Sequence, residues 1–241
     1  MIFSKILHIF RKIYSKYYLY KNPILEKIIQ STNRSISTGT EVTDYIYLYN
    51  YIKKNKPKKV LECGTGKSTF IIAAAMKEYC GKNTTLISME SEKKYHLAQK
   101  KIFPFTTFPF VKILYSPIKL YNYSFISGTG YSNIPNLKYD FIFIDGPLGA
   151  YKEKFSFEPG KINIDFLNVI LKNKNLFING VIDNRKLTTI GYSILFGKSR
   201  VYFHKFFNLG IIRNASFQNL KLKKGKYKEN HFESLVKNIN Y

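Results

Sequence analysis

The chain has 241 residues, of which 45% are hydrophobic, enough for one well-buried α/β core, whereas two independent domains would each be small. Its formal net charge of +24 would attract phosphates, anionic lipid or acidic substrates, yet only five residues are arginine, the side chain best suited to bidentate phosphate recognition. No stretch is long and apolar enough to span a bilayer, and nothing resembles a cleavable export signal.

The N-terminal segment predicts an amphipathic helix. Its apolar residues fall on one side of a helical wheel and Lys5, Lys12 and Lys16 fall opposite. The apolar residues are Ile2, Phe3, Ile6, Leu7, Phe10, Ile13, Tyr14 and Tyr17. Such a face can dock on its own domain or on a partner subunit, which is the commoner fate, or residues 1–20 can lie in an anionic membrane interface. Peripheral membrane contact and a homodimer are therefore both left open, and a cytoplasmic location is expected because the sequence shows no export signal.

Two further helices follow in chain order. One is expected over 22–30, before a polar break that ends near Gly39. Thr43 and Asp44 offer an N-cap to the next, over 45–52, and Pro57 closes it.

From Lys58 onward, apolar runs alternate with helical stretches, the pattern of a parallel sheet covered on both faces. Strands are expected at 59–62, 84–89, 111–115, 139–144 and 176–182, with a late strand pair at 201–204 and 209–212 joined through the turn-like Asn208. Helices are expected at 68–79, 92–101, 164–172 and 187–195. The loops 116–136 and 148–161 carry no signature that identifies a ligand.

This order predicts one α/β domain over 40–215, with an N-terminal helical extension over 1–39 and a basic C-terminal tail over 216–241. Cys63 and Cys80 fall at opposite ends of one helix, about 20 Å apart at 1.5 Å per residue, too far for a disulfide. We expect both to be free thiols.

The segment Glu62-Cys63-Gly64-Thr65-Gly66 joins a buried strand to a helix through a turn with two glycines. Glycine permits the turn angles and lets a ligand approach the main chain without meeting a Cβ. The following Lys67-Ser68 imitates a nucleoside triphosphate loop, but that loop needs glycine where Leu61 stands. A dinucleotide loop would need a third glycine where Thr69 stands.

The remaining Glu-x-Gly-x-Gly form resembles the first motif of the class I S-adenosylmethionine-dependent methyltransferases. The family's fold is a three-layer, Rossmann-like, mostly parallel sheet of seven strands that ends in an antiparallel hairpin, which is the order expected here. The resemblance assigns to the S-adenosylmethionine site the loop residues Glu62, Cys63, Gly64, Thr65, Gly66 and Ser68, with Glu90 and Asp145. Glu62 would orient the cofactor's ammonium, while Gly64 and Gly66 would line its methionine and ribose.

Glu90 ends the second predicted strand and resembles the family's acidic residue on the ribose hydroxyls, because a carboxylate can accept both of their hydrogen bonds. It could otherwise be an exposed carboxylate at a helix N-terminus. Glu92, two residues further along the chain, is the alternative candidate for the contact with the ribose hydroxyls.

Asp145 ends the fourth predicted strand, at the edge where α/β sheets bind ligands, whereas Asp140 opens that strand and is expected to be structural. Nucleic-acid amino-methyltransferases usually carry Asn/Asp-Pro-Pro-aromatic at this position. The chain has Asp145-Gly146-Pro147-Leu148 instead, which disfavours DNA or RNA as the acceptor.

Asp183 and Asn184 end the fifth predicted strand. With Asp145 they resemble the Mg²⁺ ligands of catechol and caffeoyl-CoA O-methyltransferases, although Leu148 replaces that subgroup's lysine, so Mg²⁺ is not favoured and no metal ligand is assigned. Methyltransferase-like proteins from surface-polysaccharide gene clusters have a similar Asp-Gly-Pro after the fourth strand. The sequence therefore resembles both this subgroup and the catechol and caffeoyl-CoA subgroup, and it does not distinguish between them.

Methylation of a hydroxyl needs a group that removes its proton, and Asp145 and Asp183 are the candidates. The predicted function is methyl transfer from S-adenosylmethionine to an oxygen of a small molecule or saccharide. The alternative is a catalytically silent protein that retains the fold for binding or as a scaffold.

Overall fold

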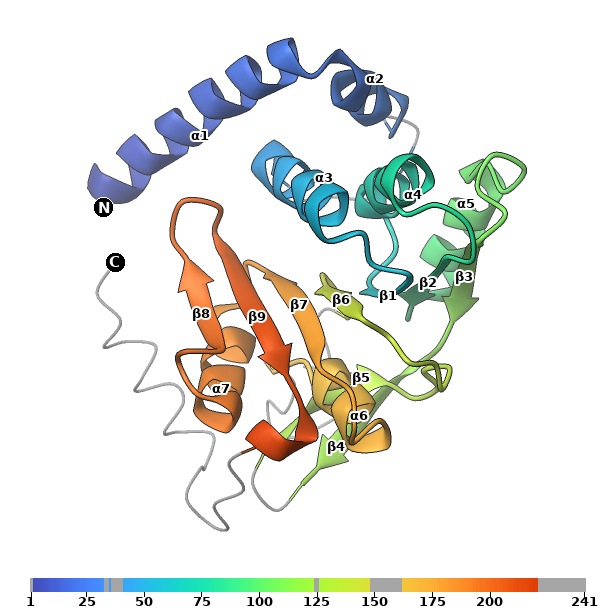
Figure 1. Cartoon of the computed structure of the whole chain (residues 1–241), viewed down its shortest axis with the longest axis vertical. Coiled ribbons are helices and arrows are strands. Elements are labelled where there is room, and N and C mark those ends of the chain that lie inside the picture. The colour runs from blue at the N-terminus through green and yellow to red at the C-terminus, as the bar shows by residue number, and fades with distance from the viewer. Residues whose placement is uncertain (1, 33–34, 36–40, 124–125, 148–161, 221–241) are drawn as a thin grey trace.

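The computed structural model describes residues 2–32, 35, 41–123, 126–147 and 162–220. It contains a sheet of seven strands in the order β3-β2-β1-β6-β7-β9-β8 (Figure 1). These strands are β1 (Lys59–Cys63), β2 (Thr85–Glu90), β3 (Val111–Tyr115), β6 (Phe141–Ile144), β7 (Ile178–Asp183), β8 (Val201–His204) and β9 (Leu209–Ala215). The first five run parallel, and β9 is antiparallel to both β7 and β8. The predicted mostly parallel sheet with an antiparallel terminal hairpin is therefore confirmed.

Helices cover both faces of this sheet. They are α1 (Ile2–Lys21), α2 (Pro23–Ser31), α3 (Val42–Asn55), α4 (Lys67–Tyr79), α5 (Lys93–Ile102), α6 (Asp165–Lys172) and α7 (Lys186–Phe196), followed by a short 3₁₀ turn, η2 (Phe217–Asn219). None of these described helices is long and apolar enough to cross a membrane.

Two hydrophobic cores lie on the opposite faces of the sheet, because successive strand residues point to opposite sides. Leu61 and Cys63 of β1 face one core with residues of α6 and α7. Val60 faces the other with residues of α3 and α4. Helix, sheet and helix therefore form three layers, and α1 and α2 lie outside α3 and α4 (Figure 1).

The sequence placed a featureless loop at 116–136, and this expectation is wrong. The segment holds an antiparallel pair, β4 (Ile118–Asn122) and β5 (Ser127–Tyr131), outside the main sheet. Gly128 and Gly130 on β5 allow α6 and its preceding turn to approach, since a Cβ on Gly130 would stand 2.5 Å from an Asp165 carboxylate oxygen. The other predicted acceptor loop, 148–161, lies outside the described residues, as do 221–241 of the predicted basic tail.

Helix α3 begins earlier than the sequence indicated. Its N-cap is Glu41 rather than Thr43 or Asp44, and Asp44 Oδ2 accepts a hydrogen bond from the Glu41 backbone N–H at 3.1 Å. Asp44 is thus the third residue of a capping box, which satisfies an N–H that the helix itself cannot pair.

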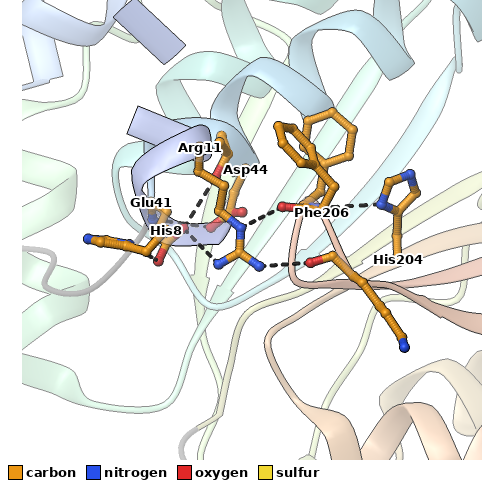
Figure 2. A network of polar contacts seen from close by, with 9 residues as sticks. His8, Arg11, Glu41, Asp44, His204 and Phe206 are labelled. Atoms are coloured by element: carbon orange, nitrogen blue, oxygen red, sulfur yellow. Dashed lines mark hydrogen bonds and ion pairs between the residues drawn. The ribbon is translucent and has the colours of Figure 1, made fainter. Parts of the chain in front are cut away.

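Helix α1 docks on its own domain. Tyr14 of the predicted apolar face takes part in this contact, whereas four other residues of that face are exposed. The Arg11 guanidinium donates to the backbone oxygens of Phe206 at 2.5 Å and Lys205 at 2.7 Å, and lies 3.6 Å from Glu41 (Figure 2). Tyr14 packs edge-on against Phe206, and Tyr18 donates to the Asn50 side chain of α3 at 2.6 Å. Among the predicted apolar-face residues, Ile6, Phe10, Ile13 and Tyr17 are exposed.

Candidate functional site

Three strand ends meet at the carboxyl edge of the sheet. The Gly64 backbone N–H donates to the Met89 carbonyl of β2 at 3.0 Å, and the Asp145 N–H donates to the Cys63 carbonyl of β1 at 2.8 Å. The loop after β1 is therefore held between the ends of β2 and β6, where ligands bind in α/β sheets.

Gly64 is required by the neighbouring loop. Its φ is +104°, and a Cβ there would stand 2.7 Å from the Gly146 backbone nitrogen. Gly146 in turn would place a Cβ 2.8 Å from the Gly64 Cα. The sequence predicts that the glycines leave room for a ligand, whereas the contact observed is between the two loops themselves.

Glu62, the fourth residue of β1, is completely buried. Thr69 Oγ1 of α4 donates to Glu62 Oε2 at 2.7 Å, and Glu62 Oε1 has no hydrogen-bond partner among the described residues. Burial raises the pKa of Glu62 to about 7, opposed by the nearby hydroxyls of Ser88, Ser68 and Thr69. A buried acid with an unused oxygen is costly without a ligand, and a cationic group would satisfy it.

The other loop residues differ in what they offer. The Cys63 side chain is fully buried in the core, where burial raises its pKa, so only its backbone borders the site. Thr65 Oγ1 lies 3.2 Å from Thr69 Oγ1, the Gly66 carbonyl accepts from Gln99 at 3.0 Å, and Ser68 is buried. Both predicted free cysteines, Cys63 and Cys80, are confirmed.

Glu90 ends β2 beside this loop and is mostly buried. Its Oε1 accepts from the backbone N–H groups of Ser91 at 2.7 Å and Glu92 at 2.8 Å. These bonds fix the carboxylate and leave Oε2 for another donor. Burial raises its pKa against the effect of those bonds. Glu92, the alternative in register, is exposed at the N-cap of α5.

Asp145 and Asp183 follow or end the adjacent strands β6 and β7, and their side chains hydrogen-bond each other. Burial and the Asp145 carboxylate raise the pKa of Asp183 to about 9, and burial raises that of Asp145. Two carboxyls that hydrogen-bond each other share one proton at neutral pH, because both cannot ionise without strong repulsion. Their hydrogen bond lowers the pKa of Asp145 and raises that of Asp183, which favours the proton on Asp183.

A third carboxyl comes from outside the sheet. Burial and the neighbouring Glu41 raise the pKa of Asp44 to about 7, and Asp44 also raises the pKa of Asp183 through its charge. Figure 2 shows Asp44 beside Arg11 and Glu41, so α1 and the start of α3 border the same edge of the sheet. The sequence did not assign Asp44 to this site.

Arg185 is a second residue that the sequence missed. It is the N-cap of α7, and its guanidinium donates to the Pro147 carbonyl at 3.1 Å and also to the Asp145 carbonyl. Its charge lowers the pKa of both Asp145 and Asp183 against the effect of burial. Arg185 therefore holds the loop after β6 and stabilises the ionised form of the carboxyl pair.

Beneath that loop lies a buried polar network. Asp165 accepts from the Tyr131 N–H at 2.8 Å and from the Asn163 side chain at 2.7 Å, and that same amide donates to the Gly146 carbonyl at 2.9 Å. Burial raises the pKa of Asp165 to about 7. The network connects β5 and the start of α6 to the Gly146 loop and so supports the site from below.

The described residues contain no group of three His, Cys, Asp or Glu side chains arranged to hold a metal ion. Asn184, the third residue of the Mg²⁺ resemblance, is exposed, with a φ of 34°. Asp140 accepts from the backbone N–H groups of Lys58 at 2.7 Å and Lys59 at 3.0 Å, which confirms its structural role.

No protein-family model matches this chain, and no curated protein matches its sequence. Solved structures do share its fold. A provisionally named O-methyltransferase from Klebsiella pneumoniae is 13% identical with a TM-score of 0.50, over 84% of this chain and 97% of that protein. A provisionally named caffeoyl-CoA O-methyltransferase from Staphylococcus aureus is 15% identical with a TM-score of 0.50, over 85% of this chain and 99% of that protein. Together with the strand order, they show that this chain shares the Rossmann-like fold of these two structures.

Proposed function

We propose that the chain is an S-adenosylmethionine-dependent methyltransferase that methylates an oxygen of a small molecule or saccharide. The observation that carries the proposal is Glu62, a fully buried acid at the carboxyl edge of the sheet with one oxygen unpaired. In this fold the loop after the first strand borders the ligand site, and the cofactor's ammonium is the cation that such an acid would bind.

The residues present fit that cofactor. Glu62 would accept from its ammonium, the backbone of the loop 63–66 would border its methionine part, and the buried Ser68 hydroxyl lies beside Glu62. Glu90 is held in place through one oxygen and would offer the other to the ribose hydroxyls. When bound, the cofactor would supply an electrophilic methyl group.

The carboxyl pair supplies a base for the acceptor. Asp145, whose hydrogen bond with Asp183 favours its ionised form, would take the proton of an acceptor hydroxyl as the acceptor oxygen bonds the methyl group and the methyl–sulfur bond breaks. The Arg185 charge favours the ionised form of Asp145 and its guanidinium holds the loop, so the base would be positioned before the acceptor arrives. This assignment needs no metal ion.

Turnover tests this proposal. Labelled S-adenosylmethionine would be incubated with sugars, catechols and lipid-linked acceptors, with and without EDTA. We expect transfer that survives EDTA and falls about 100-fold or more in Asp145→Asn. It should fall less in Asp183→Asn, whose amide still donates to Asp145, and not at all in the exposed Glu92→Gln.

Cofactor binding without transfer to any acceptor would favour a catalytically silent binding protein instead. A Mg²⁺ requirement that is lost in Asp183→Ala would establish the catechol-type mechanism.

A further inference from the structure

Helices α1 and α2 carry an exposed apolar surface, which we call the outer stripe. Its members are 45% to 76% exposed. They are Ile6, Ile9, Phe10, Ile13, Tyr17 and Tyr20 of α1, and Ile24 of α2. Within α1 they recur three or four residues apart, so they form one continuous row along the helix. Single exposed apolar residues are ordinary, but a continuous row marks an interaction surface.

The outer stripe is held facing away from the domain. Arg11 and Tyr18 lie on the side of α1 that faces the domain and Tyr14 lies beside the stripe, and their contacts with the 205–207 turn and with Asn50 fix the rotation of the helix. Turning the stripe inward would break these contacts. The surface therefore needs an occupant from outside the described fold.

Charge distinguishes between the candidate occupants. Lys12, Lys16 and Lys21 are exposed, and at 100° per residue the first two border the outer stripe on one side and Lys21 on the other. Glu26 is the sole acidic residue in the sequence of the two helices. A second copy of this chain would bring the same lysines against these, within a protein of net charge +24, so like charges would oppose that contact.

We infer that the outer stripe binds the surface of an anionic lipid bilayer. The apolar row would enter the boundary between headgroups and acyl chains, while the bordering lysines would meet the anionic headgroups, as interfacial amphipathic helices do. The inference does not depend on the proposed methyl transfer, because it rests on the docked helix alone.

The docking of α1 gives this surface a defined relation to the candidate site. Arg11 contacts the turn between β8 and β9, and β9 begins with Leu209 paired to Asp183 at the carboxyl end of β7. A bilayer on the far side of α1 would thus lie about one helix diameter, roughly 10 Å, beyond the edge of the sheet that carries Asp145 and Asp183. The N-terminal helix in Figure 1 lies across the end of the molecule to which β7 and the β8–β9 turn project.

Co-sedimentation of the full chain with vesicles tests the inference. We expect binding to phosphatidylcholine vesicles that contain phosphatidylserine, at least tenfold weaker binding to phosphatidylcholine alone, and weakening by added salt. The variant F10S/I13S/Y17S removes exposed side chains only and should lower the affinity at least tenfold. Lys12→Gln with Lys16→Gln should lower it severalfold on anionic vesicles and leave the weak binding to neutral vesicles unchanged.

The matched control is Y95S/L97S/F177S, which removes three apolar side chains of comparable exposure elsewhere and should stay within twofold of the wild type. Circular dichroism would establish that each variant is folded. No binding by the wild type, or equal losses in the stripe and control variants, would overturn the inference. A concentration-dependent dimer that F10S/I13S/Y17S abolishes, without vesicle binding, would assign the surface to a second copy instead.

Discussion

At the scale of single residues, Glu62 makes the candidate cofactor site dependent on pH. Its pKa is raised to about 7 by burial, and a bound ammonium would require the ionised form. Protonation of Glu62 therefore competes with binding below that pH. We expect the affinity for S-adenosylhomocysteine to fall about tenfold per pH unit below pH ~7.

Titration calorimetry from pH 5.5 to 8.5 measures this dependence. Glu62→Gln should bind weakly with little variation in that range, because its amide does not titrate. The assignment fails if the wild type and Glu62→Gln share one pH profile.

The acids at the strand ends were predictable because carboxyl ends of parallel strands share an edge. Glu62, Glu90 and Asp145 could be placed there from the strand pattern alone. Arg185 and Asp44 could not, because each adjoins a helix start and reaches the site only through tertiary packing. The only sequence signal for Asp44 was its capping chemistry, and that signal gave no direction toward Asp183.

At the scale of elements, the glycine loop after β1 depends on its contact with the loop after β6. We expect Gly64→Ala to lower the free energy of unfolding by about 2–4 kcal/mol, since its Cβ would meet the Gly146 backbone at 2.7 Å and alanine is strained at φ +104°. Urea denaturation measures the change.

Gly81→Ala is the matched control. Its φ is also positive, at +67°, but a Cβ there would meet only the Lys58 ammonium, at 3.9 Å. It should lose about 1 kcal/mol, from strain alone. Equal losses in the two variants would mean that the loops do not need this close approach.

The helices and strands of the main sheet were predictable because their apolar residues recur at long, regular intervals. The β4–β5 hairpin was not predictable in this way. Strand β5 reads Ser127-Gly128-Thr129-Gly130-Tyr131, and glycine ordinarily weakens a strand. Here the glycines admit Ile164 and Asp165 against the strand. The need for glycine at these positions comes from the close packing of α6 and the residue before it, and this tertiary contact cannot be recognised from the local sequence of the strand.

At the scale of the whole molecule, several buried acids make the fold more stable at low pH. Burial raises the pKa values of Asp44, Glu62 and Asp165 to about 7, and burial with the Asp145 charge raises that of Asp183 to about 9. Unfolded carboxyls titrate near 4, so the folded state binds more protons between these limits. The contribution of these four acids to the free energy of unfolding is therefore full below pH ~4 and is lost as pH rises through 7 to 9.

Thermal or urea unfolding at constant ionic strength measures this dependence. We expect stability to fall between pH 5 and 8, by on the order of 2 kcal/mol for a single acid such as Glu62, with a shallower slope in Glu62→Gln and an unchanged slope in the exposed Glu92→Gln. A stability that rises over that interval would contradict the proton sharing described for the site.

The binding of S-adenosylhomocysteine, measured by calorimetric titration at pH 8, tests the proposed cofactor site most directly. We expect one molecule bound per chain, an affinity weakened by about 1.5–3 kcal/mol in Glu90→Ala through lost hydrogen bonds, and no change in Glu92→Ala. An unchanged affinity in folded Glu90→Ala with a loss in Glu92→Ala would move the ribose contact to Glu92. No binding by the wild type at millimolar ligand would contradict the proposed cofactor and, with it, the proposed methyl transfer.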